Sequence, residues 1–113
     1  MSLGVDIEAV ERFKESYQDD HFINLIFTKQ EIAYCMQKKE PYISFTGKFC
    51  AKEAVIKASN KKLAIKDIEI LNNEFGKINV FIKGKKTPQI NCSISHTKDY
   101  AVSFVVIDKD GSK

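Results

Sequence analysis

The sequence predicts an α+β fold in which an antiparallel sheet packs on one long central helix. Helical patterns cluster in the first half of the chain, and strand patterns dominate the second half. The later strands come in pairs separated by turn-rich segments, which is typical of antiparallel hairpins. The chain has 113 residues, of which 43% are hydrophobic. This length and composition suit a single domain spanning residues 1–113 with a modest core.

The chain begins with the pattern of a short strand, "LGVDI", over residues 3–7. Apolar and polar residues alternate there, and Asp6 stands near the end of the pattern. A helix is expected from about Glu8 to Tyr17, with Val10 and Phe13 on its apolar side. The segment "QDDHFINLIF" is expected to be a loop or a short turn.

Two further helices are predicted next. Thr28 has the character of an N-cap, and Glu31 three residues later completes a capping box for a helix that ends near Met36. Pro41 interrupts the helical pattern because the residue before a proline disfavours helical geometry. A longer helix then runs from about Tyr42 to Ser59.

The second half predicts strands. "DIEILNN" and "INVFI" form a hairpin across the turn-rich "NNEFGK", and "KGKKTPQ" is a second loop. The ending, "INCSISHTKDYAVSFVVI", predicts two strands joined by a tight turn near "HTKD". We therefore expect four strands after the long helix.

The long helix carries an unusual polar stripe. Its apolar side and its small-residue side flank Glu53 and Lys57, which are one turn apart. One interpretation is an ordinary surface ion pair worth about 0.2–0.5 kcal/mol. The other is a carboxylate that binds a metal beside an ammonium that binds phosphate. Magnesium takes one or two protein carboxylates, so a distant acid such as Asp6 would complete the set.

Composition excludes several classes of protein. No apolar run approaches the roughly 20 residues of a membrane span. The N-terminus has no signal-peptide pattern, and three widely spaced cysteines favour reduced thiols, so we expect a cytoplasmic protein. The net charge is +3, and Arg12 is the only arginine. Nucleic acid is therefore not the expected partner, because arginine is the residue best suited to bidentate contacts with bases and phosphates.

Three segments in order, "GVDIEAVER", "FTGKFCAKEAVIKA" and "SISHTKDYAVSFVVI", resemble the holo-[acyl-carrier-protein] synthase family of small 4'-phosphopantetheinyl transferases. The segments "FTKQEIAYC" and "DIEILNNEFGK" resemble its second helix and its central hairpin. The resemblance implies the phosphopantetheinyl transferase-like fold. It also implies transfer of the phosphopantetheine arm of coenzyme A to a serine of acyl carrier protein, with release of adenosine 3',5'-bisphosphate.

The resemblance also assigns roles to residues. Asp6 and Glu53 match the acids that bind Mg²⁺, and Lys57 matches a lysine near the diphosphate; Glu53 and Lys57 are the expected catalytic residues. His96 matches a histidine associated with coenzyme A, for which the alternative is a turn cap. Arg12 matches an arginine on the surface that receives the acidic carrier protein.

Lys48 stands where the family usually has an arginine, which implies a coenzyme A contact through charge alone. The alternative for Lys48 and for Lys52 is a solubilising charge, with Lys52 reaching from the apolar side into solvent. The chain departs from the family in the segment "ASNKKLAIKD", which replaces a glycine-rich loop, and in "KGKKTPQ", which replaces a helix. The resemblance further implies a homotrimer with active sites between subunits.

Two alternatives from other classes stay open. A small basic module that binds nucleotide or RNA would use lysines together with aromatic side chains on an open sheet. An assembly subunit that has lost catalysis would also be compatible with the fold. The presence of both Asp6 and Glu53 favours the enzyme.

Overall fold

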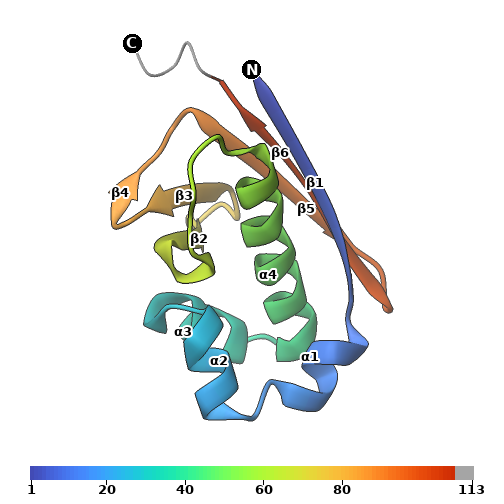
Figure 1. Ribbon diagram of the computed structural model, residues 1–113. Coiled ribbons are helices and arrows are strands. Elements are labelled where there is room, and N and C mark those ends of the chain that lie inside the picture. Colours follow the sequence, from blue (N-terminus) through green and yellow to red (C-terminus); the bar gives the residue numbers. More distant parts are fainter. Residues whose placement is uncertain (109–113) are drawn as a thin grey trace.

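The computed structural model describes residues 1–108 and has the predicted α+β class, with a long helix, α4, packed against two antiparallel sheets (Figure 1). The helices are α1 (Glu11–Ser16), α2 (Asp20–Ile26), α3 (Lys29–Met36) and α4 (Pro41–Ala58), and a 3₁₀ turn spans Ile65–Asp67. The strands are β1 (Ser2–Ala9), β2 (Ile68–Asn72), β3 (Ile78–Ile82), β4 (Lys85–Lys86), β5 (Ile90–His96) and β6 (Tyr100–Ile107). Among these residues no helix is long and apolar enough to cross a membrane.

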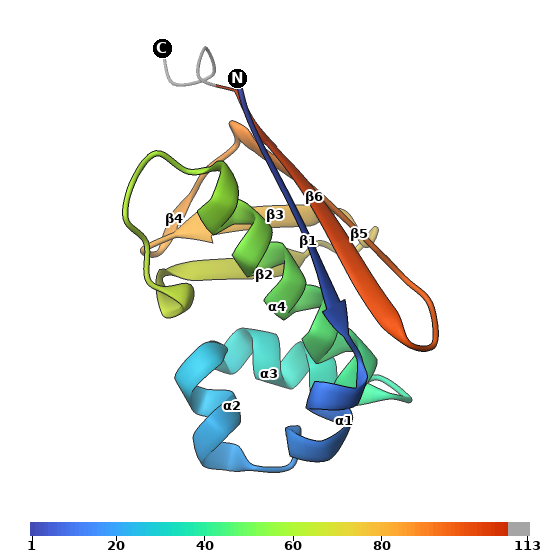
Figure 2. The same cartoon turned by 45° about the vertical axis from the view of Figure 1, so that its right-hand side comes forward.

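The larger sheet has the strand order β1-β6-β5, so the first strand of the chain pairs with the last. Asp6 lies opposite Ser103, and Glu8 lies opposite Ala101, which in turn lies opposite His96 on β5. Directly opposed residues point to the same face of a sheet, and here that face lies against α4. Figure 2 shows α4 between this sheet and the smaller sheet, whose order is β2-β3-β4.

The inner face of the larger sheet approaches α4 closely at Gly4. A Cβ atom at this position would lie 2.1 Å from the carbonyl oxygen of Ala54 and 2.9 Å from the amide nitrogen of Ala58. Ala51, Ala54 and Ala58 are all buried on this side of the helix. The predicted small-residue side of α4 is confirmed, and it brings the backbone of β1 against the helix two residues before Asp6.

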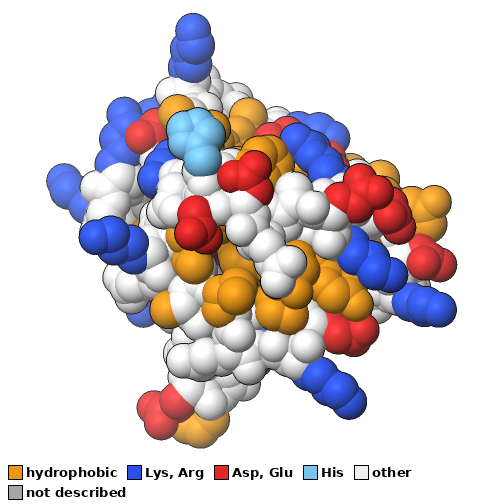
Figure 3. All heavy atoms as spheres, turned by 90° about the horizontal axis from the view of Figure 1, so that it is seen from below, with side chains coloured by type: hydrophobic (Ala, Val, Ile, Leu, Met, Phe, Trp, Pro, Cys, Tyr) orange, Lys and Arg blue, Asp and Glu red, His pale blue; other side chains and the backbone are white. Residues whose placement is uncertain are grey.

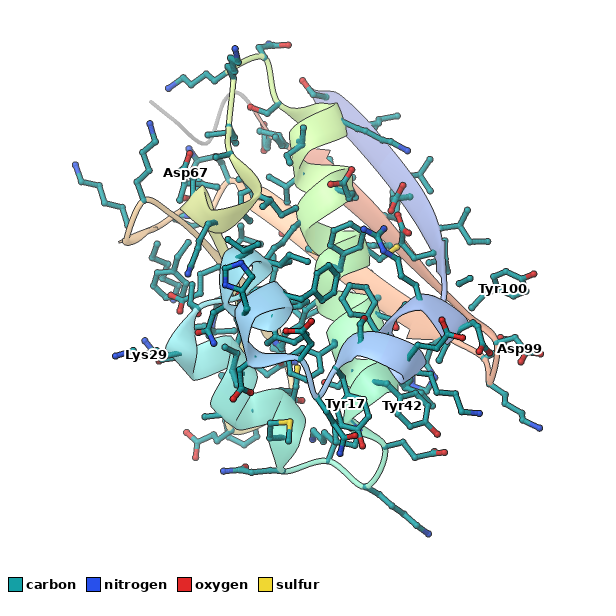
Figure 4. The ribbon with its side chains drawn as sticks, turned by 60° about the horizontal axis from the view of Figure 1, so that its bottom comes forward. Tyr17, Lys29, Tyr42, Asp67, Asp99 and Tyr100 are labelled. Carbon is teal, nitrogen blue, oxygen red and sulfur yellow. The ribbon has the colours of Figure 1, made fainter. Side chains whose placement is uncertain are left out.

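A second core forms where α1, α2 and α3 pack against the first half of α4. Phe13, Phe27, Phe45 and Phe49 are buried together, with ring centroids 4.9–5.8 Å apart. Figure 4 shows Tyr17 and Tyr42 side by side at the edge of this core. Aromatic residues thus hold the three short helices, which are too short to be stable by themselves, onto the long one.

The capping box is confirmed. Thr28 Oγ1 accepts a hydrogen bond from the amide of Glu31, and the Glu31 carboxylate accepts one from the amide of Thr28. The long helix and both predicted hairpins are also observed, within a residue or two of the expected bounds.

Three expectations about the secondary structure were wrong. The first helix begins only at Glu11, because β1 continues to Ala9, where it still pairs with Tyr100 on β6. The expected loop over 18–27 contains α2, whose N-cap is Asp19. The expected loop over 83–89 contains β4, because Lys83 and Gly84 both adopt positive φ angles (50° and 84°), as in a tight hairpin turn.

The alternative interpretation of Lys48 and Lys52, as solubilising surface charges, is contradicted by the structure. Lys48 is 2% exposed and Lys52 is fully buried. Both ammonium groups find acceptors inside the protein, which a buried charge requires. Lys48 donates to the carbonyl oxygen of Ile70, and Lys52 donates to the carbonyl oxygen of Ile26.

Candidate active site

Asp6 lies on the inner face of β1, next to the last turns of α4. Its Oδ1 accepts a hydrogen bond from Lys57 Nζ at 2.9 Å, and the same ammonium donates to the carbonyl oxygen of Val5 at 3.1 Å. The Asp6 carboxylate is nearly buried, whereas the Lys57 side chain is half exposed. This bond to Asp6 is the main reason that the pKa of Lys57 is raised above its ordinary value. The structure therefore brings together two residues predicted from distant segments.

The other oxygen of Asp6 is unusual. Oδ2 is a buried atom without a hydrogen-bond partner, and no other described side chain has one of this kind. A buried carboxylate oxygen without a partner is unfavourable unless a proton or a cation satisfies it. This oxygen thus marks a position that a proton donor or a cation would satisfy.

Glu8 is a further acid beside Asp6 that was not predicted as a site residue from the sequence. It shares the inner face of β1 with Asp6, two residues away, and its pKa is raised to about 7. Burial is the largest cause, followed by the neighbouring carboxylate of Asp6; Arg12 opposes the rise. The alternation of "VDIEA" contained the signal for this residue, but Glu8 was assigned to a helix.

Glu53 completes the group from α4. It is half-buried and lies one turn before Lys57. Its charge contributes to the raised pKa values of both Glu8 and Lys57, so Glu53 lies near these two groups, which in turn interact with Asp6. The structure therefore places Asp6, Glu8, Glu53 and Lys57 in one charged cluster between β1 and α4.

This cluster fits a magnesium ion better than a metal bound by protein groups alone. Within residues 1–108, no group of three or more histidine, cysteine, aspartate or glutamate side chains has the arrangement of a metal centre. Magnesium needs only one or two carboxylates, with water and substrate phosphates filling its other positions. Asp6 and Glu53 would supply those carboxylates, and the unpartnered Oδ2 is the atom that a cation would satisfy.

Comparison with known proteins identifies the family. The profile described as "ACPS: 4'-phosphopantetheinyl transferase superfamily" matches residues 2–105, which include every site residue predicted above. The holo-[acyl-carrier-protein] synthase of Thermodesulfovibrio yellowstonii is 46% identical over 109 residues, covering 93% of this chain and 96% of the relative. The chain belongs to the holo-[acyl-carrier-protein] synthases.

Solved structures of other synthases agree with this fold. The synthase from Bacillus anthracis, described in complex with CoA (3',5'-ADP), has a TM-score of 0.79 and 30% identity, and 94% of each chain is covered. The synthase from Helicobacter pylori, described in complex with coenzyme A, has a TM-score of 0.78 and 25% identity, with 94% of this chain and 99% of that chain covered. The same fold thus binds coenzyme A in these relatives.

The present synthase keeps His96 and Lys48 apart from the acidic cluster. Both line a cavity of about 440 Å³ between α3, α4, the β2–β3 turn and β5, together with Tyr34, Lys38 and Gly47. Lys48 donates from the wall of this cavity to Ile70 O at 2.6 Å and to Asn72 Oδ1 at 2.8 Å. Burial lowers the pKa of Lys48. His96 is exposed, and its ring makes no hydrogen bond within residues 1–108, whereas Thr97 Oγ1 accepts hydrogen bonds from the amides of Asp99 and Tyr100 in this turn.

Helix α4 separates these two groups within one chain. Asp6 and Glu8 lie on β1, one edge strand of the larger sheet, whereas His96 lies on β5, the other edge strand. Gly47 approaches Ile94 on β5, and Ala54 approaches Gly4 on β1, so α4 crosses the inner face between the two edges. The charged cluster at Asp6 and the cavity at His96, which we name the two candidate half-sites, therefore lie on opposite sides of one helix.

Arg12 lies on α1 beside the acidic cluster. Its Nη1 is 4.0 Å from Glu8 Oε1, and its guanidinium carbon is 5.0 Å from the ring centroid of Phe49. The side chain is nevertheless 53% exposed. Arg12 therefore links the outer surface of α1 to the acids of the candidate active site.

Proposed function

We propose that this synthase transfers the 4'-phosphopantetheine group of coenzyme A to a serine of apo acyl carrier protein, with Mg²⁺ as cofactor. The observation that carries the proposal is the carboxylate of Asp6, whose buried Oδ2 has no partner and lies in a cluster with Glu53, Glu8 and Lys57. The family, the fold and the coenzyme A complexes of the relatives support it.

In the proposed reaction the serine oxygen attacks the phosphorus that bears the pantetheine. The bond from this phosphorus to the bridging oxygen breaks, and adenosine 3',5'-bisphosphate leaves. Transfers of this kind depend mainly on positioning and on neutralisation of charge. Bound Mg²⁺, held by Asp6 and Glu53, would supply Lewis-acid neutralisation of the diphosphate.

The side chains of the protein are proposed to bind the substrate phosphates and to accept the serine proton. Lys57 is 54% exposed, so its ammonium can contact a ligand phosphate as negative charge develops on the leaving group. Glu53 is the proposed acceptor of the serine proton, because it is half-buried next to Lys57 and faces the same cluster. Lys48 and His96 are proposed to contact coenzyme A from the second half-site.

The carrier protein is proposed to dock on the surface around Arg12. Figure 3 views the molecule from the side of α1, α2 and α3, where hydrophobic side chains lie among both acidic and basic ones. An acidic carrier would pair with Arg12, whose guanidinium already lies beside Glu8. Docking there would deliver the carrier serine next to the acidic cluster.

A homotrimer is proposed from the outer face of the larger sheet. Leu3, Val5, Ile7, Tyr100, Val102 and Phe104 are between 38% and 64% exposed there. They alternate with inward residues on β1 and β6, so they form one apolar surface, and Figure 4 shows Tyr100 projecting away from the helices. Contiguous apolar surfaces of this kind mark interfaces.

The alternative of a nucleotide- or RNA-binding module has less support than the synthase. Phe13, Phe27, Phe45 and Phe49 are buried in the helical core, and only Tyr100 and Phe104 of the aromatic residues named above are exposed on the outer face of the larger sheet. The lysine-rich composition remains, although two lysines of α4 are also buried. A cytoplasmic location stays part of the proposal and is supported by three free cysteines, Cys35, Cys50 and Cys92.

The proposed function is tested by incubating the protein with apo acyl carrier protein, coenzyme A and Mg²⁺, and then measuring the intact mass of the carrier. The expected result is a gain equal to one phosphopantetheine group, which requires Mg²⁺ and does not occur on a carrier whose acceptor serine is alanine. An unchanged carrier mass, with tight binding of RNA instead, would establish the alternative.

A further inference from the structure

Among residues 1–108, the most completely buried charges are Lys52 and Glu31, and the proposed reaction uses neither. Lys52 Nζ lies 2.7 Å from Glu31 Oε1, and both side chains are fully buried. Glu31 Oε1 also accepts a hydrogen bond from the amide of Thr28, and Oε2 accepts one from the amide of Ile70 at 2.6 Å. Lys52 donates in addition to the carbonyl oxygen of Ile26 at 2.8 Å. The pair thus joins α4 to three other segments: the end of α2, the start of α3 and strand β2.

Stability alone does not explain this pair. Removing two charges from water is costly, and apolar residues of similar volume often replace a buried ion pair without loss of stability. The ammonium of Lys52 also lies 5.3 Å from the ring centroid of the buried Phe27, so apolar side chains could fill this position. Such a pair would leave the amides of Thr28 and Ile70 and the carbonyl oxygen of Ile26 without these partners. Hydrogen bonds to a carboxylate have a preferred angle, whereas contacts between apolar side chains have none. The ion pair therefore fixes the orientation of the segments that it joins.

The position of Lys52 around the axis of α4 relates its hydrogen bonds to the placement of Glu53. At about 100° per residue, Ala54 and Ala58 lie on the side of the helix roughly opposite Lys52, and Glu53 and Lys57 lie between the two sides. The contact of Ala54 with Gly4 sets the distance between α4 and β1. The bonds of Lys52 on the other side add a directional constraint on the rotation of the helix about its axis.

We propose that the buried pair of Lys52 and Glu31 sets the rotation of α4 about its axis and thereby holds Glu53 toward Asp6 and Glu8. Both members are positioning residues, and this inference rests on the proposed function. Side chains reach roughly 5–6 Å from a helix axis, so a rotation of about 10° displaces the Glu53 carboxylate by about 1 Å. A displacement of 1 Å can lower a rate by about 10²-fold.

The test replaces both charges with apolar side chains of similar length, in the double variant E31L/K52M. The matched control is Lys66→Met, which removes an exposed lysine that also donates to a carbonyl oxygen of α2, that of Asn24. Melting temperature is measured by circular dichroism. Steady-state kinetics give kcat and the KM for coenzyme A, and electron paramagnetic resonance gives the affinity for Mn²⁺ as a probe of the carboxylate site.

The double variant is expected to unfold cooperatively, with its melting temperature within about 10 °C of the wild type. We expect kcat to fall by about 10²-fold. The KM for coenzyme A should change by less than about threefold, because His96 and Lys48 are untouched. Mn²⁺ affinity should fall by about tenfold, as is typical when groups that orient metal ligands are lost. The control should match the wild type in all four measurements.

Wild-type kcat and Mn²⁺ affinity in a folded double variant would overturn the proposal and leave the pair a packing element. If the double variant does not fold, Glu31→Gln decides instead, measured at 10 °C and well below its own melting temperature. Its amide cannot accept both backbone hydrogen bonds, so kcat should fall at least tenfold in fully folded protein; an unchanged kcat would overturn the proposal. If the wild type transfers nothing, the proposed function fails, and the Mn²⁺ affinities alone still decide whether the pair positions Glu53.

Discussion

Replacing Gly4 by alanine tests the close approach that brings Asp6 next to α4. The added Cβ would lie 2.1 Å from the carbonyl oxygen of Ala54, whereas ordinary van der Waals contact begins at 3.4 Å. The opposing atom belongs to the backbone of a helix that is buried on both sides, so no side chain can move aside. Strand β1 must therefore separate from α4 by roughly 1 Å.

The cost follows from this displacement. Overpacking in a core costs about 1–3 kcal/mol, and a clash with backbone belongs at the upper end of that range. For a chain of this size, about 3 kcal/mol corresponds to a fall in melting temperature of about 12–20 °C. Because Asp6 moves with β1, we also expect transfer measured at 10 °C to fall by about 10²-fold.

Gly47→Ala is the matched control, because it makes the same chemical change on the opposite side of α4. Its Cβ would lie 3.1 Å from Cγ2 of Ile94, the end of a side chain that can shift by a few tenths of an ångström. Alanine is also favoured over glycine inside a helix by up to about 1 kcal/mol. We expect the melting temperature of this control to be unchanged or higher. A Gly4→Ala protein that melts within 2 °C of the wild type and transfers normally would refute the argument.

Four further changes test the site and its surroundings. Glu53→Gln should lower transfer by about 10²–10³-fold with little change in melting temperature, whereas the exposed Glu74→Gln should change neither; equal activities would exclude Glu53 from the site. The pKa of Glu8 is about 7 in the folded protein and 4.5 in the free group, so the folded protein is stabilised below pH 4.5 and loses this stabilisation as the pH rises to 7. The melting temperature in EDTA should therefore fall over this pH range, and Glu8→Gln should make the fall smaller. Identical pH profiles for the two proteins would contradict the raised pKa. Arg12→Glu should raise the KM for the carrier by about tenfold or more and leave that for coenzyme A nearly unchanged, while equal losses would contradict the docking surface. Phe104→Asp should convert the proposed trimer to monomers in size-exclusion chromatography with light scattering, with loss of transfer; an active variant of unchanged mass would refute the interface.

Local patterns in the sequence were sufficient for much of the fold. The capping box of Thr28 and Glu31 depends on residues three positions apart, and each hairpin depends on two neighbouring strands and a turn. These features form from short-range contacts, so the residues that specify them lie close together in the sequence. The ordered motifs also identified the family and predicted Asp6, Glu53, Lys57, His96, Lys48 and Arg12, whose roles remain proposals.

Contacts between distant segments decided the rest. Strand β1 runs on to Ala9 because β6, from the other end of the chain, provides a partner, and this extension turns Glu8 toward Asp6. Lysine is usually exposed on protein surfaces, but Lys52 of α4 is buried because the carboxylate of Glu31 lies opposite it. The sequence by itself determined which residues are acids, bases and helix formers. Only tertiary packing determined which charges leave water and which lie together, because desolvation and pairing depend on the groups that surround each charge in space.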